Sequence, residues 1–310
     1  MRRTTWWTGA LLLLAGMALA AGGGCRSGAP VRGQAAGGPA PAPTRTASHE
    51  PWLRQASDYP WTRTASRYEP LIARCPTPAG YTRATVAPKS WGEWLRYLPL
   101  LPPGTPVRVE SGQPVVAGSS PELAGVVDLD VRRDQECADV IFRLRAEYLR
   151  WAGREAEISF PADNIHLSWS QWQRGVRPHQ VRGRLTLERS ATPSASRASF
   201  DRYLASVYAW SGTYSIADAG RPAKYAKLRP GDYLVHAGDA GCGHVVLIAD
   251  VMRDTAGHAW ALILQGYKPA QSAHVLAPGN GSPWFALDPT KPVVTPGWPQ
   301  FEWTELREIR

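Results

Sequence analysis

The sequence predicts an α+β fold, with helices ahead of an antiparallel sheet in one domain that spans residues 66–310. Two observations support this prediction. Apolar residues recur at helical spacing near residues 134–151 and again near 200–211, whereas four short apolar segments between residues 232 and 276 have the length of strands. Short loops rich in Gly and Asp separate these segments, which is typical of antiparallel strands.

The clearest helix is expected from Asp134 to Trp151. Its acidic first turn suits a helix N-terminus, and its apolar face comprises Cys137, Val140, Ile141, Leu144, Tyr148 and Trp151. A shorter helix is expected at Trp91–Leu98, and another near Phe200–Ser211. The long helix is therefore the main candidate to pack on the sheet.

Strands are expected on both sides of these helices. The segment Leu123–Val131 alternates and is rich in β-branched residues. The C-terminal strands are expected at Asp232–His236, His244–Val251, Ala259–Gln265 and His274–Leu276, with shorter ones at Glu157–Phe160 and Arg184–Glu188. A candidate catalytic core thus covers residues 123–277.

The first 25 residues have the parts of a secretory signal. Arg2 and Arg3 precede an apolar stretch, residues 6–21, that is short for a membrane span, which needs about 20 apolar residues. Three glycines then precede Cys25, the expected site of lipidation. The alternative is cleavage near residues 18–20, which would give a soluble periplasmic or secreted protein. Arg26 after the lipidated residue favours an outer-membrane lipoprotein that faces the periplasm.

Residues 26–65 are rich in Pro, Gly and Ala, a composition typical of a disordered tether. The net charge is +9, but only five of the 35 basic residues are Lys, and the Arg residues are scattered. The sequence therefore favours anionic headgroups or cell-wall polymers over nucleic acid as partners. It shows no Cys/His spacing of the familiar zinc types, so we expect neither a metal nor a cofactor.

Four cysteines raise the question of disulfides. If Cys25 carries lipid, three thiols remain in an oxidising compartment, and three pairings are open. Their contexts favour a bridge between Cys75 and Cys242, which lies in a Gly-rich loop. Cys137 is then the free thiol.

Three residues could form a nucleophilic site. Cys137 lies in the first turn of the long helix, His244 opens a strand, and Gln265 ends the following strand. A helix N-terminus favours a thiolate, a nearby His can take its proton, and an amide can orient the imidazole. His236 is a competing base and Cys242 a rival nucleophile. Cys137 can equally be a small buried hydrophobe.

This order resembles the papain-like cysteine peptidases, in particular the NlpC-type cell-wall peptidases and related amidases. The resemblance lies in Pro230-Gly231-Asp232 before YLVHAG and in Gly243-His244 before VVLIADV. It implies a Cys-bearing helix packed on an antiparallel sheet and hydrolysis of an envelope amide, such as a peptidoglycan stem peptide. The chain departs from the family at Cys137, where QECA replaces Asp-Cys-Ser-Gly, and two carboxylates near the thiol oppose thiolate formation.

A closer resemblance is to an uncharacterised bacterial lipoprotein family, domain of unknown function 4846. The matching stretches include VVDLDVRRDQECADVIFRLRAEYL, GDYLVHAGDAGCGHVVLIADV and LILQGYKPAQSAHVL. This resemblance implies the envelope location and the fold, but no activity. A non-catalytic lipoprotein that binds glycan, peptide or protein is therefore the alternative to a hydrolase.

Tryptophans are frequent, with 14 in the chain against five Phe. Trp151, Trp169 and Trp172 lie close together in the sequence and could line a groove for glycan or peptide. The alternative is that these side chains fill the core of a Phe-poor protein.

Overall fold

The structure, a computed structural model, describes residues 58–62, 69–115, 123–238 and 243–309. The predicted signal segment, Cys25, most of the predicted tether and Cys242 lie outside the described residues.

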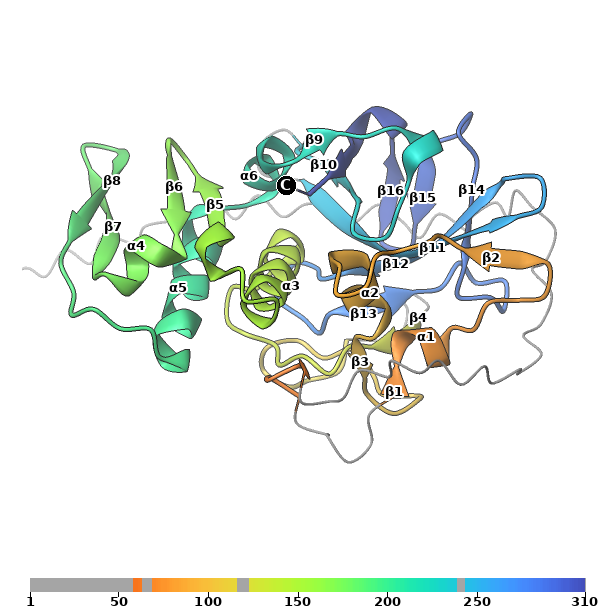
Figure 1. The fold of residues 1–310 in the computed structure, drawn as a ribbon, viewed down its shortest axis with the longest axis horizontal. Coiled ribbons are helices and arrows are strands. Elements are labelled where there is room, and N and C mark those ends of the chain that lie inside the picture. The colour runs from red at the N-terminus through yellow and green to blue at the C-terminus, as the bar shows by residue number, and fades with distance from the viewer. Residues whose placement is uncertain (1–57, 63–68, 116–122, 239–242, 310) are drawn as a thin grey trace, which may run out of the picture.

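A large antiparallel sheet organises the C-terminal half of the domain (Figure 1). Its main path runs β4 (Leu123–Val126), β13 (His274–Leu276), β12 (Ala259–Gln265), β11 (His244–Asp254), β10 (Tyr233–His236), β17 (Leu306–Glu308) and β9 (Arg221–Pro222). Two further strands, β14 (Phe285–Leu287) and β2 (Tyr81–Arg83), pair with β12 and β11. The predicted α+β class is therefore confirmed.

The four predicted C-terminal strands are confirmed almost to the residue. The largest difference is β11, which runs to Asp254 instead of Val251 because its far end pairs with β2. Alternate residues of β11 enter different cores: Val245 and Leu247 belong to one hydrophobic cluster, Val246 and Ile248 to the other. The sheet therefore carries a core on each face.

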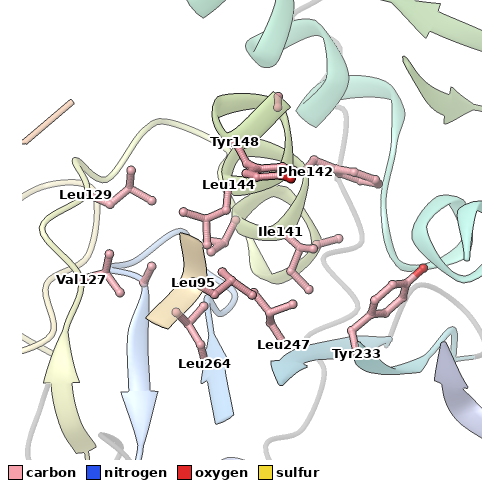
Figure 2. Close-up of a cluster of buried hydrophobic side chains, with 14 of the residues drawn as sticks. Leu95, Val127, Leu129, Ile141, Phe142, Leu144, Tyr148, Tyr233, Leu247 and Leu264 are labelled. Carbon is pink, nitrogen blue, oxygen red and sulfur yellow. The ribbon is translucent and has the colours of Figure 1, made fainter. Parts of the chain in front are cut away.

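Helix α3 (Cys137–Trp151) covers the first of these faces. It begins three residues later than predicted, since Glu136 is the N-cap and exchanges capping hydrogen bonds with Asp139. Figure 2 shows Ile141 and Leu144 of α3 near Leu247 and Leu264 of the sheet. A Cys-bearing helix packed on an antiparallel sheet is thus observed.

Polar side chains of α3 are buried in pairs. Arg143 is fully buried and bonds Asp130 and Gln135, while Glu147 is bonded at both carboxylate oxygens by Arg197. Because these two buried charges each have an opposite partner, this side of α3 can be enclosed by the chain.

The N-terminal elements pack beside α3. They are β1 (Glu69–Pro70), α1 (Leu71–Arg74), α2 (Trp91–Arg96) and β3 (Pro99–Leu100). Tyr59 and Trp61 are buried against Trp94, and the Tyr59 hydroxyl donates to the Trp94 carbonyl at 2.9 Å. The predicted boundary of the tether at residue 65 is therefore too late, because the domain already packs at residue 59.

Residues 155–211 extend one end of the molecule (Figure 1). They form β5 (Ser159–Ala162), β6 (Ile165–Ser168), α4 (Trp169–Gln173), β7 (Val176–Val181), β8 (Arg184–Arg189) and α5 (Arg197–Trp210), with a short 3-10 turn at Glu155–Glu157. Helix α5 starts before the predicted Phe200 because Ser196 caps it by accepting the Ser199 N–H. Helix α6 (Thr213–Ala219) and the turn Tyr225–Lys227 return the chain to the sheet.

The C-terminal segment lies on the second face of the sheet. Strands β15 (Val293–Thr295) and β16 (Trp298–Phe301) form a hairpin, and the turn Trp303–Glu305 precedes β17. Phe301 and Val293 belong to the hydrophobic cluster that includes Val246 and Ile248. The β15–β16 hairpin therefore covers the face opposite α3.

Candidate functional site

The Cys137 thiol lies at the N-terminus of α3 and against the start of β11. The backbone N–H groups of Val245 and Ala138 lie close enough to lower the pKa of the thiol. Ile248 directs its backbone groups toward β10, so Val245, three residues earlier, directs its N–H toward β12. Strand β12 ends at Gln265, before it reaches Val245, and this N–H is therefore available to the thiol.

Gly266 makes this close approach possible. A Cβ atom at Gly266 would lie 2.6 Å from Val140 Cγ2 and 3.0 Å from the Glu136 carbonyl oxygen. The chain that leaves β12 thus passes directly against the first turn of α3. Only glycine fits there without moving the helix away from the sheet.

The electrostatic state of the thiol differs from the prediction. The helix N-terminus was expected to favour a thiolate, but burial, followed by the nearby Asp139 and Glu136 carboxylates, raises the pKa of Cys137 to about 12. The N–H groups of Val245 and Ala138 oppose this rise without overcoming it. The resting thiol is therefore neutral at physiological pH, and the expected activation is wrong for this conformation.

A row of buried polar side chains crosses three adjacent strands at the same end of the sheet. His244 Nε2 lies 2.9 Å from Gln265 Oε1, and Gln265 Nε2 lies 3.2 Å from His274 Nε2. His274 Nδ1 lies 2.9 Å from the Ser272 carbonyl oxygen. The predicted contact of Gln265 with His244 is therefore present, and His274 extends it.

The Ser272 carbonyl fixes the direction of every hydrogen bond in this row. A carbonyl only accepts, so His274 Nδ1 donates to it, and in the neutral ring Nε2 accepts from Gln265. Gln265 then presents its oxygen to His244, whose Nε2 must donate. Burial lowers the pKa of both histidines to about 4, so both are neutral near pH 7. His244 Nδ1 is consequently left as the basic nitrogen.

Aromatic side chains enclose the His244 ring. Its centroid is 5.0 Å from that of Tyr267, 5.2 Å from Trp298 and 6.0 Å from Phe301. The Tyr267 hydroxyl donates to the Gly297 carbonyl at 2.6 Å and so joins this segment to the β15–β16 hairpin. The hydrogen bonds of the described residues include none between the thiol and the imidazole. In this conformation the His244 ring lies on the side of the β15–β16 hairpin, whereas Cys137 belongs to the core that α3 covers, so the predicted nucleophile and base are at the same end of the sheet but face different sides of it.

Removing the Tyr267 side chain is expected to expose Cys137. Tyr267 contacts His244, and a Cys137 thiolate would raise the Tyr267 pKa, which places the two side chains close together. We expect Tyr267→Ala to raise the rate of Cys137 alkylation by iodoacetamide by about tenfold or more, since exposure favours the thiolate. Peptide mass spectrometry measures this rate.

Two controls accompany the alkylation measurement. Burial also raises the pKa of Cys75 to about 12, so this thiol should stay unreactive in both proteins. Tyr81→Ala removes a tyrosine of β2, the strand that pairs with the far end of β11, where its ring packs edge-on against Trp260. Equal rates at Cys137 in the wild type and Tyr267→Ala would show that Tyr267 does not cover the thiol.

The buried histidines should make the protein less stable in acid. Because burial lowers the pKa of His244 and His274 from 6.5 to about 4, the unfolded chain binds more protons between these values. Their contribution to stability is therefore lost as pH falls from 6.5 toward 4. We expect His274→Gln to reduce the slope of unfolding free energy against pH in this window by up to about 1.4 kcal/mol per pH unit. Urea titrations at several pH values measure the slope, and equal slopes would contradict the assignment.

The two rival assignments have different outcomes. His236 lies opposite His244 in the β10–β11 pair, but its ring is largely exposed and Nδ1 lies 2.6 Å from Glu305 Oε1. Because Glu305 holds the His236 ring at the surface, His236 is not placed to act as a base for the Cys137 thiol. Cys242, the rival nucleophile, lies outside the described residues.

Cys75 is a free, buried thiol in this structure, and its predicted partner Cys242 lies outside the described residues. The Cys75 carbonyl accepts from Arg83, which also pairs with Asp250. The bridge between Cys75 and Cys242 therefore stays a prediction.

The predicted aromatic groove is also wrong for two of its three residues. Trp169 is fully buried against Phe200 and Tyr203, and Trp172 donates to the Ser199 hydroxyl in the same core. Their spacing on α4 reflects packing against α5. Trp151 alone lines a surface pocket, which has a volume of about 450 Å³ and is also formed by Lys89, Tyr148, Ala152 and Arg154.

His274 and Tyr267 were not among the predicted site residues, although they contact Gln265 and His244. His274 opens a predicted strand, as His244 does, and a polar residue at that position was the available signal. Tyr267 follows the strand that Gln265 ends, but only the tertiary structure places it beside the β15–β16 hairpin. Among the described residues, no group of three or more His, Cys, Asp or Glu side chains is arranged to hold a metal ion. None of the described helices is long and apolar enough to cross a membrane.

Comparison with known proteins identifies a family and no activity. Residues 71–308 match the family model described as domain of unknown function 4846. No curated protein and no solved structure matches the chain. The match covers the sheet, α3 and the whole row from His244 to His274. The chain therefore belongs to the DUF4846 family.

Proposed function

We propose that the protein is an envelope-anchored lipoprotein with a papain-like cysteine hydrolase site that cleaves an amide, with peptidoglycan stem peptides as the substrate class. One observation carries this proposal. Cys137 lies beside the Val245 N–H on the side of α3, while the adjacent residue, His244, donates Nε2–H to Gln265, keeps Nδ1 basic and packs against the β15–β16 hairpin. The three side chains lie at the same end of the sheet, and hydrolysis would use them as nucleophile, base and orienting amide.

The reaction uses these groups in two steps. His244 Nδ1 takes the thiol proton, the sulfur bonds the amide carbon, and the C–N bond breaks as His244 returns the proton to the leaving amine. Water, activated by the same nitrogen, then attacks the thioester and releases the acid and the thiol. In this mechanism the Cys137 backbone N–H would stabilise the oxyanion of both steps.

The described conformation is a covered form of this site. The thiol is 7% exposed, its pKa is raised to about 12, and Tyr267 and the β15–β16 hairpin enclose the imidazole. Substrate entry therefore requires Tyr267 and the hairpin to move. The His244 ring would then have to move from the hairpin side to the Cys137 side of the sheet end, where it would form the ion pair that the resting protein lacks.

The same burial favours a second candidate, a non-catalytic lipoprotein that binds glycan, peptide or protein. In such a protein the thiol would be a core residue and the His–Gln–His row a structural network. If the protein only binds its ligand, Cys137→Ala should bind that ligand as well as the wild type does, and the wild type should not hydrolyse it.

Digestion of a mixture of muropeptides separates the two candidates. We expect the wild type and Cys75→Ala, a matched buried-thiol control, to release new peptide products detected by mass spectrometry, and Cys137→Ala to release none. Product from all three proteins, or from none, would contradict the hydrolase. The anchor is tested separately, because palmitate labelling should disappear in Cys25→Ala.

A further inference from the structure

The β7–β8 hairpin projects from the end of the molecule that is farthest from the main sheet (Figure 1). Its two strands pair only with each other, from Val176 opposite Arg189 to Val181 opposite Arg184. The turn between them consists of Arg182 and Gly183, both with positive φ. The tip therefore holds an arginine in a conformation that usually favours Asn or Gly.

The hairpin and the residue that leads into it carry excess positive charge. Residues 174–189 contain one acidic residue, Glu188, and five arginines: Arg174, Arg177, Arg182, Arg184 and Arg189. Five minus one leaves a net charge of +4. Among the described residues, none of these five guanidinium groups forms an ion pair, whereas Arg143, Arg150 and Arg197 in and beside α3 all do.

Apolar side chains are exposed among these arginines. Val181, next to the turn, is 52% exposed, and Leu187 is 38% exposed. They are two of the four large hydrophobic residues that the described chain exposes; the others are Tyr214 and Val294. The register places Val181 on one face of the hairpin with Arg184 and Leu187 on the other face with Arg189, while Arg177 lies over the Trp172 ring. Each exposed aliphatic side chain thus has an arginine without an ion pair beside it, which matches a bilayer interface, where headgroup phosphates pair with arginine and aliphatic groups enter the acyl boundary.

We propose that the β7–β8 hairpin docks on the surface of an anionic phospholipid bilayer. Charge complementarity supports this occupant, and the exposed aliphatic residues favour a bilayer over nucleic acid, which would use aromatic side chains for stacking. The inference is independent of the chemistry at Cys137. It is compatible with the proposed anchor, because the 32 residues between Cys25 and Asp58 span at most about 110 Å.

Vesicle binding tests this proposal. The unacylated full chain is sedimented with vesicles of phosphatidylcholine alone or mixed equally with phosphatidylglycerol, and the ratio of the two affinities is compared among variants. The N-terminal segment is common to all variants, so its contribution cancels. An arginine at an anionic surface contributes about fivefold in affinity, so two charge reversals in R182E/R184E should lower the ratio by more than tenfold.

The matched control is K224E/K227E. It makes the same change of net charge at two exposed lysines outside the hairpin and should lower the ratio by less than threefold. Val181→Asp should weaken binding to the anionic vesicles as well. An equal loss in both double variants, or wild-type binding that does not depend on phosphatidylglycerol, would overturn the proposal. So would binding to a DNA duplex with no binding to vesicles.

Discussion

Replacing His244 by alanine is expected to lower the rate of amide hydrolysis by about a thousandfold, the upper range for loss of a general base that also protonates the leaving group. The reason is that His244 Nδ1 is the only basic nitrogen of the His–Gln–His row that takes no part in the hydrogen bonds of the row. Its Nε2 proton is committed to Gln265, and Gln265 is in turn committed to His274. Initial rates on the muropeptide cleaved by the wild type measure this effect.

His236→Ala is the matched control for this loss. It removes an imidazole directly opposite His244 on the neighbouring strand, and its ring is held by Glu305 at the surface. We expect a rate within about twofold of the wild type, as for a surface substitution away from the chemistry. A large loss of rate in His236→Ala with a small loss in His244→Ala would show that the base lies on β10 and would contradict the proposed role of His244.

Removing the Asp250 carboxylate is expected to lower the free energy of unfolding by about 3–5 kcal/mol, the usual cost of leaving a buried charge without its partner. Asp250 is fully buried at a bulge in β11 and pairs with Arg83 and Arg96. In Asp250→Ala both guanidinium groups would remain buried without a carboxylate. Urea titration at pH 7 measures the loss.

Asp218→Ala provides the comparison. Asp218 lies exposed on α6 and has no ion pair among the described contacts, so its removal should change stability by less than about 0.5 kcal/mol. A cost below about 1 kcal/mol for Asp250→Ala would mean that solvent reaches the two arginines and that this cluster does not hold β2 and α2 to the sheet.

The elements that could be predicted from the sequence are those whose signal is local. Helix α3 and strands β10 to β13 are long, apolar and periodic, and the structure places them within a few residues of the prediction. The start of α3 was placed too early because Asp134 and Glu136 both suit a first turn. The capping pair of Glu136 and Asp139 decides between them.

Short strands escaped prediction because pairing creates them. Strands β2, β14 and β17 have three residues each and exist because they hydrogen-bond to β11, β12 and β10. Trp169 and Trp172 do not line the predicted groove for a related reason. A Trp pair at helical spacing fits a ligand groove or a core equally well, and only the position of α5 decides between them.

The candidate site shows the same division between local and non-local causes. The order of the elements was enough to bring Cys137, His244 and Gln265 to one end of the sheet. The state of the thiol was not predictable, because its burial depends on chain segments distant in sequence, among them β11 and the region of Tyr267. A helix N-terminus lowers a thiol pKa only where solvent or an opposite charge also favours the thiolate.

The central claim is that Cys137 is a nucleophile activated by His244, and acyl transfer to the thiol tests it without knowledge of the natural substrate. The protein is incubated with the nitrophenyl ester of a short peptide, and the acylated residue is identified by peptide mass spectrometry. The thiol displaces nitrophenolate, so each thioester formed releases one coloured anion. The account predicts an adduct on Cys137 in the wild type and in Cys75→Ala, formed at least about a hundredfold more slowly in His244→Ala. An adduct on Cys75, no adduct on Cys137, or an equal rate in His244→Ala would contradict it.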